Sequence, residues 1–138
     1  MTTLIVARVA SFVRDDTAEV LIAGFAEFAD GSGRALLFQA ATYEPKEQDV
    51  RGGMDTYCIT NSDGSAVKYG GLRQAQLVGN ELSLLFTLET AHAFGIDDEV
   101  KVSFEVDAGA LRKFKDGFPQ VVLVPWGRAD QVPTLSGF

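Results

Sequence analysis

The sequence has little of two residue types on which protein chemistry often depends. Cys58 is the only cysteine and His92 the only histidine among the 138 residues. A single cysteine excludes an internal disulfide, so an oxidising compartment would bring this chain no such stabilisation. One cysteine and one histidine would also need two carboxylates to complete a four-ligand zinc site. We therefore predict a protein with no disulfide, metal or cofactor.

Long apolar runs are also lacking. No stretch approaches the roughly 18 apolar residues that a membrane helix needs. The N-terminal segment MTTLIVARVASFVRDD has Arg8 inside its apolar run and lacks the small-residue cleavage site of a secretory signal. We therefore expect a cytoplasmic protein without a membrane partner.

Basic residues are few relative to acids. Lysine and arginine together number 12 against 19 aspartates and glutamates, which gives a net charge of -7. This balance argues against a nucleic-acid partner, because a phosphate backbone demands a basic surface. A basic protein partner would instead be attracted. Acidic composition also favours solubility, so charge excludes partners more firmly than it identifies them.

The residues that are present predict one folded β-rich domain over residues 1–138. Hydrophobic residues make up 46% of the chain and charged residues 22%, which is typical of a globular protein. The length suits a single core, and no domain boundary or repeat is visible. We predict a mostly β domain, α+β at most. It should have eight or nine largely antiparallel strands, arranged as a barrel or a sandwich, and one short C-terminal helix.

Alternation of apolar and polar residues with a period of two predicts most of these strands. Residues 2–13 carry apolar side chains on both faces, so this strand should be covered on both sides. Turn-forming clusters separate the early strands, namely DD at 15–16, DGSG at 30–33 and NSDGS at 61–65. The expected strands span residues 2–13, 17–28, 34–42, 54–60, 66–69, 72–78, 81–89 and 100–106, with a last apolar segment at 121–124.

The clearest hairpin lies around Gly79 and Asn80. These two residues permit a primed two-residue turn, which pairs Leu77 with Leu82 across the strands.

Helical signals lie towards the C-terminus. A helical turn is expected at 90–95, and a helix at 108–116 with Asp107 as its N-cap and Gly117 as its end. The polar tail 127–138 is expected to be mobile.

Residues 43–57, YEPKEQDVRGGMDTY, form the longest segment without apolar periodicity. Residues 44–55 contain four acids and two bases, and the pair of glycines at 52–53 predicts a sharp turn. We therefore predict an acidic loop, followed by a strand in which Asp55 and Tyr57 share one face. The alternative is a structural segment, with an acid that caps a turn and a tyrosine half-buried at a sheet edge.

Four short motifs in and around this segment resemble a known family. They are FQ at 38–39, EQD at 47–49, GMDTYC at 53–58 and YGG at 69–71. Together they resemble the Imm10 family of immunity proteins, which accompany bacterial polymorphic toxins. One departure is that Ala40 and Ala41 stand where the family usually has an arginine after the glutamine. The resemblance implies a mostly β, non-catalytic antidote that binds its cognate toxin in the cytoplasm.

The resemblance also suggests which residues touch the toxin. Many such toxins have basic clefts, which an acidic loop with an aromatic anchor could occupy. We therefore expect Glu47, Asp49, Asp55 and Tyr57 to bind the partner. The alternative is that Gly53, Asp55 and Tyr57 hold the fold and leave other surface to select the toxin.

Two other classes of function stay open at this point. A β interior lined by several of the ten phenylalanines could hold a small apolar ligand. An enzyme could use carboxylates, although the sequence points to no particular pair. A Cys-His hydrolase would need Cys58 and His92, which we interpret as a buried structural cysteine and an incidental histidine. We therefore predict no catalytic residues.

Overall fold

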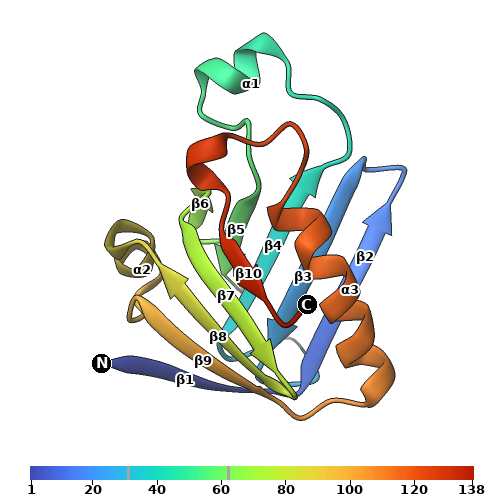
Figure 1. Cartoon of the computed structure of the whole chain (residues 1–138), viewed down its shortest axis with the longest axis vertical. Coiled ribbons are helices and arrows are strands. Elements are labelled where there is room, and N and C mark those ends of the chain that lie inside the picture. The colour runs from blue at the N-terminus through green and yellow to red at the C-terminus, as the bar shows by residue number, and fades with distance from the viewer. Residues whose placement is uncertain (31, 62) are drawn as a thin grey trace.

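The computed structural model describes residues 1–30, 32–61 and 63–138, which form two five-stranded sheets (Figure 1). Sheet A has the strand order β1-β9-β8-β7-β10, and sheet B has the order β2-β3-β4-β5-β6. The strands of sheet A are β1 (Thr2–Ala7), β7 (Leu72–Val78), β8 (Glu81–Phe86), β9 (Glu99–Phe104) and β10 (Thr134–Ser136). Those of sheet B are β2 (Val9–Asp15), β3 (Val20–Ala26), β4 (Ala35–Ala41), β5 (Cys58–Asn61) and β6 (Val67–Tyr69).

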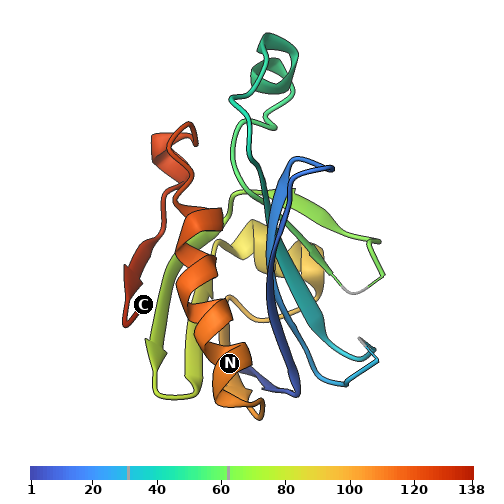
Figure 2. The same cartoon turned by 90° about the vertical axis from the view of Figure 1, so that its right-hand side faces the viewer.

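The two sheets form a sandwich that holds helix α3 (Ala108–Val122) at its open side, as Figure 2 shows. All neighbouring strands are antiparallel except the pairs β1–β9 and β10–β7. The prediction of a mostly β, largely antiparallel fold with a C-terminal helix is therefore confirmed, with a sandwich as its form. The turn signals at 30–33 and 61–65 include Gly31 and Ser62, which lie outside the described residues.

The first predicted strand is in fact two strands that belong to different sheets. The chain leaves sheet A after Ala7 and enters sheet B at Val9, and Arg8 N–H donates to Ala26 O at 3.0 Å at this corner. β1 alternates exposed and buried residues, with Leu4 71% exposed. The prediction that residues 2–13 are covered on both faces is therefore wrong, because one face of β1 is exposed and the buried positions change from odd numbers in β1 to an even number, Ala10, in β2.

The hairpin of β7 and β8 matches its predicted register. Leu77 pairs with Leu82, and Gly79 adopts the positive φ of 61° that a primed turn requires. The second strand ends earlier than residue 89, because Thr87 caps helix α2 (Leu88–Phe94) by accepting a hydrogen bond from Thr90 N at 3.2 Å. The helical turn expected at 90–95 is therefore confirmed over residues 90–94, within a helix that starts earlier and ends at Gly95 as its C-cap.

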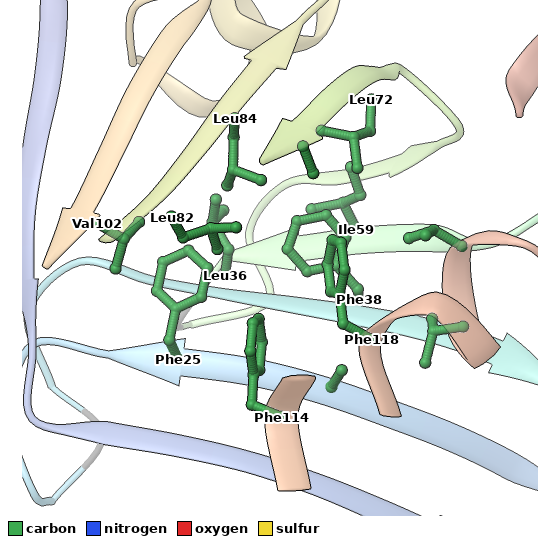
Figure 3. Packing of buried hydrophobic residues seen from close by; sticks show 14 of the residues in the cluster. Phe25, Leu36, Phe38, Ile59, Leu72, Leu82, Leu84, Val102, Phe114 and Phe118 are labelled. Carbon is green, nitrogen blue, oxygen red and sulfur yellow. The ribbon is translucent and has the colours of Figure 1, made fainter. Parts of the chain in front are cut away.

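Helix α3 supplies the centre of the core between the sheets (Figure 3). Phe114 and Phe118 are fully buried, and their rings stack with centroids 5.3 Å apart. The predicted end of this helix at Gly117 is wrong. Burial of one large apolar side chain stabilises the fold by about 1.5–3 kcal/mol, which exceeds the cost of about 1 kcal/mol for a glycine inside a helix. The helix therefore continues to Val122, so the apolar segment at 121–124 begins as its last turn.

The C-terminal tail packs along sheet A. After the 3-10 helix η1 (Ala129–Gln131), β10 pairs in parallel with β7, and the ring of Phe138 stacks on Phe118 at 5.2 Å. The expected mobility of this tail stays a prediction, although the pairing of β10 with β7 and the stacking of Phe138 argue against it. Among the described residues, none of the helices has the length and apolarity to cross a bilayer.

Candidate functional site

Residues 42–57 form an arm that projects beyond the ends of the strands, at the top of both Figure 1 and Figure 2. The arm leaves β4, carries the short helix α1 (Glu47–Arg51) at its tip, and returns to β5. Sequence analysis predicted a loop here, and the helix arises from local capping. Asp49 Oδ2 accepts a hydrogen bond from Lys46 N at 2.9 Å, and Gly53 turns the chain with φ of 73°.

Two of the four expected contact residues lie on α1. The Glu47 side chain is 85% exposed and pairs with Arg51 at 3.3 Å, one helical turn away. Asp49 is half-buried, because its carboxylate caps the helix and faces a groove beside the arm. An exposed ion pair such as Glu47–Arg51 contributes little stability, so Glu47 is available to a partner.

The other two residues, Asp55 and Tyr57, lie at the base of the arm and are buried. They precede β5, which begins only at Cys58, so the predicted strand at 54–60 is wrong in its first four residues. Asp55 Oδ1 lies 3.5 Å from Nε of Arg128 in the C-terminal segment, with poor hydrogen-bond geometry. Their contact with a partner stays a prediction, and their burial gives both residues a role in holding the arm.

Tyr57 joins three parts of the chain through one hydroxyl group. The oxygen accepts a hydrogen bond from Leu72 N at 3.1 Å, and the O–H donates to Gln131 O at 3.1 Å. Burial raises the pKa of Tyr57 to about 12, because an ionised phenolate would lose its hydration there. The tyrosine therefore ties the arm to β7 and to η1 in its neutral form.

The two glycines of the YGG motif lie at this junction. Gly70 and Gly71 have φ of 75° and 96°. A Cβ at Gly70 would overlap the side chain of Gln131, whose Oε1 accepts from Gly71 N at 2.9 Å. The two glycines thus allow the C-terminal segment to lie against the base of the arm.

Beside the arm lies a groove of about 220 Å³. One wall is the outer face of sheet B, which contributes Gln39, Ala41 and Cys58, and another is the arm itself. Its complete lining is Ala18, Glu19, Val20, Gln39, Ala40, Ala41, Tyr43, Pro45, Asp49, Met54, Thr56, Cys58, Tyr69 and Trp126. These described residues include two carboxylates and three aromatic rings but no lysine or arginine.

Burial and negative charge shape the ionisation of groups in this groove. Burial is the main cause that raises the pKa of Tyr69, and charges on Cys58, Asp49 and Tyr43 raise it further. Burial also raises the pKa of the Cys58 thiol. A thiol that stays protonated is a weak nucleophile, so Cys58 is poorly suited to catalysis. His92 lies exposed on α2 and does not line the groove.

The sequence singled out the arm but missed the groove. Glu19, Tyr69 and Trp126 come from three distant segments, and no local pattern indicates that they meet. Within the described part of the chain, no group of three or more His, Cys, Asp or Glu side chains is arranged to hold a metal ion.

Comparison with known proteins yields one family. The sequence profile of the family described as Immunity protein 10 matches residues 6–112, which include the whole arm and every groove residue except Trp126. No curated protein matches the chain, and no solved structure matches it.

Proposed function

Because the chain belongs to the Immunity protein 10 family, we propose that it is an immunity protein that binds and neutralises a cognate bacterial toxin without catalysis. The family match carries this proposal, since it extends over most of the chain and includes all four expected contact residues. The action would take place in the cytoplasm, where a chain with one cysteine needs no disulfide. The partner would belong to a polymorphic toxin system.

We propose the arm as part of the toxin-binding surface. It projects from the sandwich, none of the residues of α1 is buried, and its acids can complement a basic cleft. Glu47 and Asp49 would make the contacts, while Asp55 and Tyr57 hold the base of the arm from below. Two of the four residues thus take the contact role that the sequence suggested, and the other two take the structural role that was its alternative.

The test is a pull-down of the tagged protein with the product of the adjacent upstream gene, followed by calorimetry at two salt concentrations. We expect binding that weakens as salt increases, because exposed charges are screened beyond roughly 10 Å at 0.1 M salt. Failure of the protein to bind any neighbouring gene product would contradict the immunity role.

A charge reversal tests the arm itself. Replacing Glu47→Lys together with Asp49→Lys should weaken toxin binding while the melting temperature changes little, since only the cap of a five-residue helix is lost. The matched control is Glu81→Lys with Glu99→Lys, which changes the charge equally on the exposed face of sheet A. Equal binding by the two double variants, or a large loss of melting temperature in the first, would contradict a contact role for the arm.

The alternative of an apolar ligand in the β interior gains little support. The buried phenylalanines pack against one another, with ring centroids 5.0 Å apart for Phe38 and Phe118 and 6.1 Å apart for Phe25 and Phe104. Heating the protein with lipids or flavins tests this alternative, because a ligand bound to the folded state would raise the melting temperature.

A further inference from the structure

The groove beside the arm combines apolar walls with two acids. Tyr43, Met54 and Tyr69 are each about two-fifths exposed, at 44%, 41% and 38%. Trp126 is half-buried on the same lining. We infer that this groove receives one arginine or lysine side chain of the toxin, with its apolar stem against these side chains and its charged head at Glu19 and Asp49. This inference rests on the proposed function and names the chemistry of the partner.

The size of the groove fits a single side chain. Its volume of about 220 Å³ lies below the range of roughly 300–1,000 Å³ that is common for small-molecule sites. Arginine and lysine have long apolar stems that pack on hydrophobic surfaces while their charged ends stay near water. Their cationic ends are also attracted to the faces of tyrosine and tryptophan rings.

Glu19 has an unusual backbone conformation at this position. It is the only described residue other than glycine with a positive φ, at 55°. Its carbonyl accepts a hydrogen bond from Thr42 N at 3.0 Å, which fixes the turn before β3 against the start of the arm. A side chain in the left-handed region costs of order 1–3 kcal/mol, and such strain is concentrated at functional positions. The presence of a carboxylate at this strained position agrees with a role in binding.

The groove opens onto the outer face of β3 to β6, which carries no charged side chains, while Asp15 at the end of β2 lies at the edge of the same face. The outward residues of β3 to β6 are Val20, Ile22, Gly24, Ala26, Ala35, Leu37, Gln39, Ala41, Cys58, Thr60, Val67 and Tyr69. The exposed face of sheet A differs, since it carries Glu81, Glu99 and Lys101. Depletion of charge at the centre with charge at the rim is typical of protein interfaces.

Charge also distinguishes a toxin from a second copy of this chain. The chain has a net charge of -7, and the lining of the groove contains carboxylates without a basic residue. Two copies docked through this face would bring like charges together, which costs energy. A partner surface that presents a cation would remove this repulsion.

The experiment compares Glu19→Gln and Glu19→Gly with the control Glu99→Gln, using the toxin identified by the pull-down. Both Glu19 variants should bind at least about tenfold more weakly, while the control binds as the original chain does. Glu19→Gly should also keep or raise the melting temperature, because glycine relieves the positive φ. In addition, the bound toxin should slow alkylation of Cys58, the only cysteine, by a maleimide.

The outcomes separate this inference from the proposed function. If the unaltered protein fails to bind the toxin, the proposed function fails. If it binds, but both Glu19 variants bind equally well or Cys58 reacts at the same rate in the complex, the groove is not occupied and the inference fails alone. Weak binding accompanied by a lower melting temperature in both variants would show a structural role for Glu19. This result would also overturn the inference.

Discussion

At the scale of single residues, Tyr57 shows how one buried side chain at the base of the arm can hold the arm against the sandwich. Its ring is fully buried, and its hydroxyl meets Leu72 of β7 and Gln131 of η1. Removing this hydroxyl would leave Leu72 N–H buried without a partner. The free energy of an unsatisfied buried group exceeds the net gain from a typical hydrogen bond.

We expect Tyr57→Phe to lower the free energy of unfolding by about 1–3 kcal/mol at pH 7. Urea denaturation measures this change. The control is Tyr43→Phe, since the side chain of Tyr43 is 44% exposed on the arm. A loss of stability in the control as large as that in Tyr57→Phe would contradict the special role of the buried hydroxyl.

Tyr57 should also make stability depend on pH in the alkaline range. Its pKa is raised from the ordinary 10.0 to about 12 in the folded state, so between these values the unfolded chain releases the proton first. The tyrosine contribution is complete below pH 10 and decreases as the pH rises towards 12, by about 1.4 kcal/mol per unit at most. Denaturation at pH 9 and 11 should show a steeper decrease in the original chain than in Tyr57→Phe.

At the scale of elements, α3 depends on a close approach that only glycine permits. A Cβ at Gly117 would overlap the ring of Phe12 on β2. At Gly109, near the start of the same helix, the nearest atom would be Asp107 Oδ1 at 3.2 Å. Replacement by alanine should therefore be much more costly at Gly117 than at Gly109, although both lie in one helix.

Gly117→Ala should lower the free energy of unfolding by about 1–3 kcal/mol, because the core must shift to admit a methyl group. Gly109→Ala should change it by less than about 1 kcal/mol, since alanine favours a helix and the capping carboxylate can move slightly. Denaturant unfolding of both variants decides the matter. A smaller loss for Gly117→Ala than for Gly109→Ala would be inconsistent with the contact to Phe12.

The C-terminal strand gives a second prediction at this scale. Phe138 is half-buried and stacks on Phe118, which is part of the core. We expect Phe138→Ala to lower the free energy of unfolding by roughly 1–3 kcal/mol, and Val132→Ala, at an exposed position before β10, to change it by less than about 0.5 kcal/mol. Equal stabilities of the two variants would support the mobile tail that the sequence suggested.

Local signals account for the elements that sequence reasoning predicted well. The β7–β8 register follows from Gly79 and the alternation on either side, and α2 follows from its own cap and glycine end. The corner at Arg8, the continuation of α3 beyond Gly117 and the pairing of β10 depend on contacts with distant strands. Period and propensity contain no information about such contacts. For the same reason the sequence indicates the acids of the arm, which are close together in the chain, but not the groove, whose residues come from distant segments.

At the scale of the whole molecule, the acidic surface should act mainly on the rate of association. The net charge of -7 would attract a basic toxin from a distance, and salt screens this attraction. We expect the association rate constant to decrease several-fold between roughly 0.05 and 0.3 M salt, while the dissociation rate constant changes less. Stopped-flow or surface-based kinetics measure both. A salt effect confined to dissociation would contradict long-range attraction.

The arm is fastened only at its base. Asp55 and Tyr57 anchor it from below, whereas none of the residues of α1 is buried. If the proposed contacts of Glu47 and Asp49 hold, folding and toxin binding depend on separate sets of side chains within fifteen consecutive positions, 43–57. The residues at the tip of such an arm can be substituted without disturbing the packing of the sandwich. The same sandwich could thus be directed to a different toxin by substitution of a few exposed residues of the arm.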